Sequence, residues 1–384
     1  MIEREQTGAF LTRLRQAHAW TQKDVASRLH VSAQAVSKWE NGLAVPPLDL
    51  LLELSRLYGV TMEEIANGRF EQEKIDHAHL DVHVERWDRF NEESHPDNVW
   101  NPSFRGGVLE RSDGSLLVSR TLEPGAKQHL AFEQGALKEL VDDALVTLDN
   151  DWITMNARPL ALTMTILSGQ EDLPLFSRLT TLVRTAGRKQ GMPLIEAQRS
   201  VKPFMKPEET QIVFTGIGEA KRPYDARRIE AGDSIYYWPS NGLHHHGFTI
   251  MEALLERRPE WKTKRLLDEL LKAPVSYAGK TNGYEDIKCL VHITQFGLER
   301  NVRRVLKPDQ KAVLELDKVK IPPVFHWLKR ALSYSDAEMM KTFNCGMGML
   351  VIAKNGDPAY RLGQIESRND KEEAVVIHSP LHWE

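Results

Sequence analysis

The chain of 384 residues contains only two cysteines, Cys289 and Cys345. Two cysteines cannot build a disulfide framework, and no cysteine or histidine spacing typical of a zinc site is present. No apolar run approaches the roughly 20 residues needed to cross a membrane, and the first residues are charged rather than signal-like. These absences exclude disulfide-rich, zinc-ribbon and membrane-spanning proteins, and they predict a cytoplasmic protein.

The chain also lacks an excess of charge of one sign. Its 50 Lys and Arg residues against 54 Asp and Glu residues give a formal net charge of −4. This balance excludes a general electrostatic coat for nucleic acid, so any DNA binding must come from a local surface. No short repeat or low-complexity tract appears, and the length suffices for two or three domains with their own cores.

Residues 21–42 have the pattern of two short helices joined by a tight turn. Thr21 and Asp24 are spaced as a capping box at the start of the first helix, and Ser32 is a suitable N-cap for the second. The pair Asn41-Gly42 favours a left-handed end to the second helix. Apolar residues recur at helical spacing in both segments, namely Val25, Ala26, Leu29, Val36 and Trp39.

Three further segments complete a unit of five helices. A helix is predicted over residues 4–17, another begins after Pro46-Pro47, and a second capping box over residues 61–64 opens a short fifth helix. With these neighbours, residues 5–67 resemble the DNA-binding domain of the phage Cro and repressor class, also called the xenobiotic-response-element class. The resemblance implies that the second helix of the motif reads the major groove of DNA. The alternative is a helical bundle that contacts only protein.

The polar face of that second helix supplies the expected DNA contacts. Gln is suited to recognition of adenine, and Ala can contact the methyl group of thymine. We therefore expect residues 34, 35, 37 and 38 to face base edges, while Gln22 and Asn41 contact the phosphate backbone. The predicted DNA-binding set is Gln22, Ser32, Gln34, Ala35, Ser37, Lys38 and Asn41.

Residues 1–68 are thus predicted to form an all-α domain. Residues 69–79 are rich in charge and poor in large apolar side chains, which predicts a linker or a solvated connecting helix. Beyond them, strands and helices alternate, which predicts an α/β or α+β body. Strands are expected at 115–120, 144–148, 160–167, 211–216, 234–238 and 347–353, and helices at 176–189, 248–257 and 261–271.

The last part of the chain carries the most specific motif of the body. Residues 321–349 predict a helix after a Pro-Pro pair, then a Thr-Phe-Asn-Cys-Gly turn and an apolar strand. Upstream landmarks follow in order at residues 242–247 (Gly-Leu-His-His-His-Gly), 273–277, 292–294 and 299–306. Together these segments resemble aminoimidazole ribonucleotide (AIR) synthetase, the cyclo-ligase of purine biosynthesis, clearly over residues 205–384 and faintly over 80–204.

The resemblance implies a two-lobed α/β (α+β) PurM-like body, with lobes at residues 80–240 and 241–384. It also implies a homodimer formed through the first lobe, with nucleotide-binding clefts along that interface. The family uses ATP and magnesium, and phosphoryl transfer depends on acidic metal ligands. Here Leu122 stands where the family has an acid, and Gln198 replaces a glutamate. We therefore expect a degenerate site without catalytic residues or metal ligands, and a protein that is not an enzyme.

Ligand binding does not require those acids, because phosphates need cations and backbone donors. We predict that Lys127, Asn150, Asp151 and Arg199 bind ATP or another purine-type nucleotide, with or without magnesium. The predicted function is a sequence-specific DNA-binding transcription regulator that dimerises and senses a nucleotide. Two alternatives stay open: an active ATP- and magnesium-dependent ligase or kinase fused to a DNA-binding domain, and a purely structural dimeriser.

Two other features are interpreted as structural. The consecutive histidines His244, His245 and His246 lie in a turn, where neighbouring residues rarely converge on one metal ion. Cys345 lies in the tight turn before the last apolar strand without a base nearby in the sequence, so a small buried residue is expected there.

Overall fold

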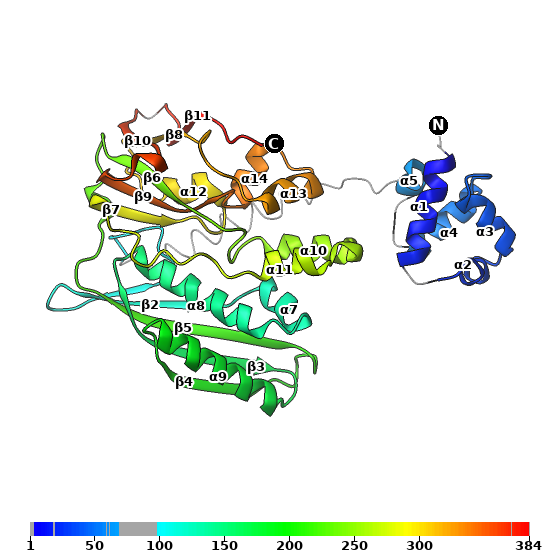
Figure 1. The fold of residues 1–384 in the computed structure, drawn as a ribbon, viewed down its shortest axis with the longest axis horizontal. Helices are drawn as coiled ribbons and strands as arrows, with labels where there is room; N and C mark the ends of the chain where they lie inside the picture. The colour runs from blue at the N-terminus through cyan, green and yellow to red at the C-terminus, as the bar shows by residue number, and fades with distance from the viewer. Residues whose placement is uncertain are drawn as a thin grey trace. The chain divides into compact units, whose positions relative to one another are not determined.

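The computed structural model describes residues 4–17, 20–58, 60, 62–68, 98–369 and 371–383, and it divides into two compact units (Figure 1). The first unit includes residues 4–68, and the second includes residues 98–254 and 263–383. The predicted linker at residues 69–79 lies outside the described residues. Within the described ranges, no helix is both long enough and apolar enough to cross a membrane.

The first unit is the predicted bundle of five helices. These are α1 (Arg4–Ala17), α2 (Gln22–Arg28), α3 (Ala33–Glu40), α4 (Leu48–Tyr58) and α5 (Met62–Asn67). Both predicted caps are confirmed: the capping box joins Thr21 and Asp24, and the Ser32 hydroxyl accepts the backbone N–H of Ala35 at 3.2 Å. Gly42 has φ +69°, a left-handed conformation that ends the segment as expected.

The core of the first unit receives apolar side chains from all five helices. The buried members include Phe10, Leu14, Val25, Leu29, Val36, Trp39, Leu51, Leu54 and Ile65. Burial of each such side chain is worth about 1.5–3 kcal/mol, so this core fixes the orientation of α2 and α3. The spacing of Val36 and Trp39 therefore decides which face of α3 points outward.

The second unit begins with a five-stranded sheet in the order β1-β2-β5-β3-β4. Its strands are β1 (Gly107–Glu110), β2 (Leu116–Leu122), β3 (Arg158–Ser168), β4 (Leu194–Val201) and β5 (Thr210–Ala220). Only the β3–β4 pair is parallel. Helices α7 (Ala126–Glu133) and α8 (Leu137–Ile153) lie between β2 and β3 in the chain, and α9 (Leu173–Lys189) lies between β3 and β4. Helix α8 packs against β2, β3 and β5, and α9 packs against β4 (Figure 1).

The strand predicted at residues 144–148 is wrong, because this segment lies inside α8. Buried residues of α8 recur three or four apart, at positions 137, 140, 141, 144, 145, 148 and 152. A short apolar run such as Ala144–Leu148 fits a buried strand and a buried helix equally well when it is taken alone. The longer period over the whole helix distinguishes the two structures.

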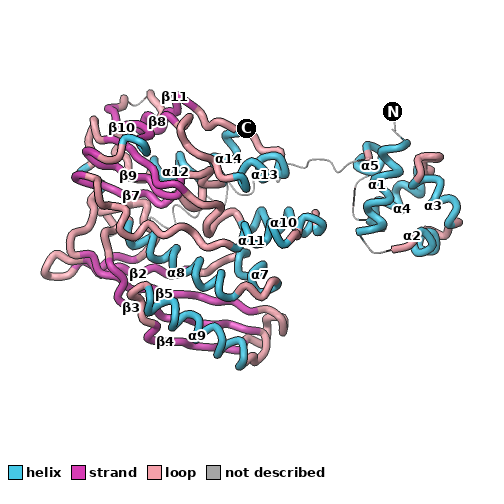
Figure 2. The backbone as a smooth tube through the Cα atoms, viewed as in Figure 1, coloured by secondary structure: helices cyan, strands magenta, loops and turns pink. Residues whose placement is uncertain are grey.

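A second sheet of six strands has the order β11-β8-β10-β6-β9-β7. Figure 2 draws the strands in magenta. The strands are β6 (Ser234–Pro239), β7 (Glu285–His292), β8 (Gln310–Glu315), β9 (Met347–Asn355), β10 (Arg361–Ser367) and β11 (Val375–Ser379). The remaining helices that the structure describes are α10 (Phe248–Arg257), α11 (Lys264–Leu271), α12 (Gly297–Arg303), α13 (Pro323–Leu332) and α14 (Asp336–Thr342). Short 3-10 turns lie at Ala226–Arg228, Pro259–Trp261 and Pro358–Tyr360.

The pairing of β6 corrects the predicted boundary between the lobes. This strand pairs with β9 and β10 of the second sheet, although the first lobe was expected to extend to residue 240. The chain therefore passes from the first sheet to the second between residue 220, where β5 ends, and residue 234, where β6 begins. The helix expected from residue 261 begins at Lys264, where the Thr263 hydroxyl accepts the backbone N–H of Leu266.

Candidate functional sites

The helix-turn-helix presents α3 with one buried face and one exposed face. Val36 and Trp39 are only 2% and 5% exposed, whereas Gln34, Lys38 and Asn41 are exposed. Positions 34, 38 and 41 are four and three residues apart, so they line one side of the helix and its end. Ala35 and Ser37 are partly exposed beside them. The predicted base-reading residues therefore share a continuous outer surface.

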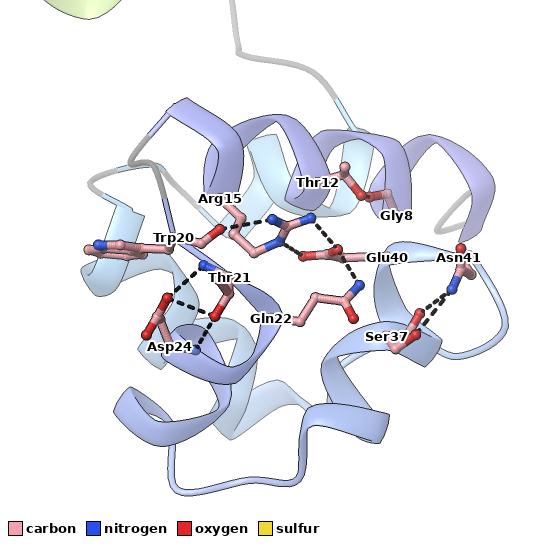
Figure 3. Close-up of polar contacts among 10 residues, drawn as sticks. All are labelled: Gly8, Thr12, Arg15, Trp20, Thr21, Gln22, Asp24, Ser37, Glu40 and Asn41. Atoms are coloured by element: carbon pink, nitrogen blue, oxygen red, sulfur yellow. Dashed lines mark hydrogen bonds and ion pairs between the residues drawn. The ribbon is translucent and has the colours of Figure 1, made fainter.

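A buried carboxylate fixes the position of this helix (Figure 3). Glu40, at the end of α3, accepts Nε of Arg15 at 2.7 Å and Nη2 at 3.0 Å, and it accepts Nε2 of Gln22 at 2.8 Å. Arg15 also donates Nη1 to the carbonyl of Trp20 at 2.8 Å. The hydrogen bond with Glu40 raises the pKa of Arg15. One carboxylate thus joins α1, α2 and α3, a role that local sequence patterns do not reveal.

The predicted DNA-binding residues differ in what they bond within the domain. Gln22 is engaged with Glu40, Ser32 caps α3, and the side-chain amide of Asn41 donates to the carbonyl and hydroxyl of Ser37 at 2.8 and 3.2 Å. The side chains of Gln34 and Lys38 have no hydrogen-bond or ionic partner among the residues that the structure describes. These two are the side chains most available to an external ligand.

A second group of polar side chains lies in the second unit around Asp143 of α8. Its Oδ1 accepts Nζ of Lys127 at 2.7 Å, and its Oδ2 lies 2.8 Å from Nδ1 of His245. Lys127 is 0% exposed and also donates to the carbonyls of His244 and Lys272 at 2.9 and 3.2 Å. Burial lowers the pKa of Lys127, whereas the pKa of Asp143 falls despite burial because Lys127 and His245 oppose it.

A neighbouring group centres on Asp151, near the end of α8. Nε of Arg120 lies 2.8 Å from Oδ2, and Nδ1 of His292 lies 2.7 Å from Oδ1. Burial disfavours the charged carboxylate, but Arg120 and His292 together hold the pKa of Asp151 well below its usual value. Both carboxylate oxygens are therefore engaged by side chains of the protein. Asn150 instead donates to the carbonyl of Val275 and accepts the backbone N–H of Tyr277.

The consecutive histidines do not share a partner. His245 bonds Asp143, whereas both ring nitrogens of the buried His244 have no hydrogen-bond partner. Burial, with the positive charges of His292 and Lys127, lowers the pKa of His244 to about 3, and its backbone has a left-handed φ of +61°. Burial also lowers the pKa of His246. Over the described ranges, no cluster of three His, Cys, Asp or Glu residues could hold a metal ion.

The structure does not bring the four predicted nucleotide residues together. Lys127 is fully buried, the Asn150 side chain bonds the backbone carbonyl of Val275, and Asp151 pairs with Arg120. Arg199 lies on β4 in a surface pocket with Phe176 and pairs with exposed Glu171 at 3.1 Å. The sequence patterns missed four charged or titratable residues that surround Lys127 and Asp151, namely Arg105, Arg120, Asp143 and His292. Of these four, only His292 lies in a sequence segment that resembles the family, at residues 292–294.

Two separate parts of the chain match family models. Residues 11–65 match the helix-turn-helix family model, and residues 230–377 match AIR synthase related protein, C-terminal domain. A phosphoribosylformylglycinamidine cyclo-ligase from Cupriavidus necator is 28% identical over 286 residues, which cover 68% of this chain and 82% of the relative. The enzyme of the same name from Neisseria meningitidis serogroup C is 29% identical over 287 residues, covering 68% and 83%.

Solved structures share the fold of the body. Thiamine monophosphate kinase from Aquifex aeolicus has a TM-score of 0.53 and 15% identity, covering 78% of this chain and 98% of that one. AaThiL complexed with AMPPCP and TMP has the same TM-score and identity, covering 77% and 94%. At this identity the likeness shows the fold alone. The chain therefore joins an N-terminal helix-turn-helix domain to a body whose residues 230–377 match AIR synthase related protein, C-terminal domain.

Proposed function

We propose that this protein is a sequence-specific DNA-binding transcription regulator, and that its PurM-like body dimerises and senses a ligand. The observation that carries the proposal is the outer surface of α3. Gln34 and Lys38 are exposed and have no partner among the described residues, while Val36 and Trp39 anchor the opposite face. A helix held in this way can enter the major groove without rearrangement of its own domain.

The residue types on this surface suit base recognition. The Gln34 amide can form two hydrogen bonds with adenine, and Lys38 can donate to guanine or to a phosphate. Ala35 provides a methyl group for contact with thymine. Gln22 and Asn41 are proposed to contact phosphates at the edges of the motif. Hydrogen bonds with Glu40 and Ser37 already orient these two side chains.

The face of the first sheet opposite α8 supports dimerisation. In β5, a Cβ at Gly216 would lie 2.3 Å from the Trp152 ring of α8, so α8 covers the face on which residue 216 lies. Val213 and Ile217 point to the opposite face, where they are only partly buried, and Leu109 of β1 is 63% exposed. A sheet face with such apolar side chains is stabilised when another layer covers it. A second copy of the chain would provide that layer and a second recognition helix.

The state of Asp151 supports binding rather than phosphoryl transfer as the role of the body. Magnesium requires free oxygen ligands, and both oxygens of this carboxylate are engaged by Arg120 and His292. The residues present therefore do not fit a magnesium site at this position. The proposed ligand is a purine-type nucleotide or a related phosphorylated compound, consistent with AMPPCP and TMP in a protein of the same fold. Lys127 and Asn150 are proposed to support the binding site through their contacts within the protein. A direct contact between Arg199 and the ligand is a separate prediction.

An enzyme is the second candidate function. The relatives in sequence are cyclo-ligases, and His244 is buried, unpartnered and held at positive φ, as residues of reactive sites often are. Magnesium-dependent hydrolysis of ATP by the purified chain would support this candidate.

The regulator is tested by selection of genomic DNA fragments with the full-length protein, followed by footprinting of the enriched fragments. We expect one preferred site with two related half-sites about one helical turn apart. Recovery of fragments with no shared sequence would contradict the proposal.

A further inference from the structure

Arg105, just before β1, forms no ion pair with a carboxylate within the described part of the chain. Its Nη1 and Nη2 donate to the side-chain oxygen and the carbonyl of Gln295, which are both uncharged. Its Nε is buried without an acceptor. Burial and the nearby charge of Arg120 lower the pKa of Arg105 to about 10, although the charge of Asp151 acts in the opposite direction. A guanidinium in this condition is costly unless an anion is present.

The neighbouring groups leave the same area with surplus positive charge. Arg120 and His292 bond the two oxygens of Asp151, so Arg105 interacts with the charge of this carboxylate without a hydrogen bond to it. His292 is only 7% exposed, and its Nε2 has no hydrogen-bond partner. Two guanidinium groups therefore face one carboxylate, and a deeply buried imidazole nitrogen beside them is unpaired.

The turn after β7 adds an aromatic surface to this cluster. Phe296 lies in the turn with φ +73°, and the guanidinium carbon of Arg105 lies 5.3 Å from the centre of its ring. Arg300 and Arg304 of the same segment lie over that ring at 5.0 and 5.9 Å. The charge of Arg300 also acts to lower the pKa of Arg105. Three arginines thus lie around the Phe296 ring, and Arg105 is the one among them that also interacts with Arg120 and Asp151.

Solvent can reach this cluster. Arg105 and Arg120 are partly exposed, and Gln295 beside them is exposed. Guanidinium groups bind phosphate oxygens through paired N–H donors, and they are the preferred partner of phosphate in partly buried sites. A phosphate would supply the missing negative charge and could accept hydrogen bonds from Arg105 and Arg120.

We propose that Arg105, Arg120 and the Nε2 edge of His292 form a binding site for a phosphate group. The inference rests on the ligand-sensing part of the proposed function, and it names the ligand class and the residues that bind it. The phosphate is either free inorganic phosphate or the phosphate of a monoester. The site surrounds Asp151, one of the four residues that the sequence indicated, and adds two arginines that lie outside any sequence motif.

The test compares the full-length protein with Arg105→Gln and a matched control, Arg184→Gln, which removes the same charge from the exposed surface of α9. Melting temperature and binding heat are measured with sodium phosphate, AMP and ribose 5-phosphate. Sodium chloride at equal ionic strength, adenosine and ribose serve as the reference solutes. We expect phosphate or a monoester to stabilise the parent protein and Arg184→Gln, and Arg105→Gln to raise Kd at least about tenfold.

Without added anion, Arg105→Gln should melt at the same temperature as the parent or higher, because a partly buried charge without a bonded carboxylate has been removed. A purely structural role for Arg105 predicts a lower melting temperature instead. Arg120→Gln provides a second variant, with the same expected loss of anion binding. Stronger binding of monoesters than of inorganic phosphate would identify an organic ligand, and equal binding would identify free phosphate.

The inference is overturned if no phosphate compound stabilises the parent protein beyond the chloride reference, or if both arginine variants bind as the parent does. Operator binding, measured in parallel, keeps the two proposals separate. Operator binding without anion binding removes only this inference. Anion binding that leaves operator affinity unchanged supports the site but contradicts the sensing role.

Discussion

The guanidinium of Arg15 and the carboxylate of Glu40 form an ion pair with two hydrogen bonds, Nε–Oε1 at 2.7 Å and Nη2–Oε2 at 3.0 Å, which joins α1 to the end of α3. Their side chains are only 15% and 6% exposed. Removal of one partner from such a pair leaves the other charge buried and unpaired. The orientation of α3, and with it any DNA recognition, therefore depends on a contact between residues 25 positions apart.

Glu40→Ala should destabilise the first unit by about 3–5 kcal/mol, because it leaves Arg15 without its carboxylate and Gln22 without its acceptor. Hydrogen exchange of the full-length protein, followed by mass spectrometry, would show faster exchange in peptides from residues 20–58 and little change in the second unit. Glu53→Ala, on the exposed side of α4, is the matched control. Equal protection in both variants would refute the structural role of the pair.

Gln34→Ala should weaken binding by about 1–3 kcal/mol at one base position and relax specificity there. The reason is the loss of paired hydrogen bonds to a base edge rather than loss of charge. Competition assays with operators substituted one base pair at a time provide the measurement. A uniform loss for all sequences would show that the residue does not read a base.

Leu109→Glu should convert a dimer into monomers. Leu109 is 63% exposed in a single chain, so the change disturbs a covering partner rather than the fold of its own sheet. Multi-angle light scattering should detect the change in mass, and operator affinity should fall by about 100-fold, because the second recognition helix is lost. Leu173→Glu, 52% exposed on α9, is the control. A Leu109→Glu protein that stays dimeric would exclude this face as the interface.

Burial raises the pKa of Asp149 from 3.8 to about 6. A raised pKa means that the folded protein disfavours the charged carboxylate, so the fold is more stable while Asp149 is protonated and less stable once it is charged. That stability is complete below pH 3.8 and is lost as the pH rises through 6. Asp149→Asn should therefore stabilise the protein at pH 8 by roughly 2–3 kcal/mol and have little effect near pH 4. Urea unfolding at the two pH values measures the difference, and an equal effect at both would contradict it.

Local rules predicted the first unit well, because its landmarks are short-range. Thr21 and Asp24 cap a helix three residues apart, and Gly42 ends one through its own backbone. The predictions for the body that failed were also local. The run 144–148 has the same apolar character in a strand and in a helix, so its neighbours along α8 were needed to decide.

The site in the body could not be predicted because its partners are far apart in the sequence. Lys127 has the charge expected of a residue that binds phosphate. Its ammonium group is instead bonded by Asp143 and by carbonyls 117 and 145 residues away in the sequence. Asp151 likewise meets His292 across 141 residues. Residue type alone cannot show whether a charge is already neutralised within the fold.

The most direct test of the central claim is the ratio of affinities for the selected operator and for a scrambled duplex. It is measured with the full-length protein at about 0.15 M salt, where nonspecific electrostatic binding is suppressed. The protein should prefer the operator by about 10³-fold or more, and the double variant Gln34→Ala/Lys38→Ala should lose most of that preference while the second unit keeps its stability. A parent ratio near one, or a ratio that the double variant leaves unchanged, would contradict the claim that α3 reads DNA.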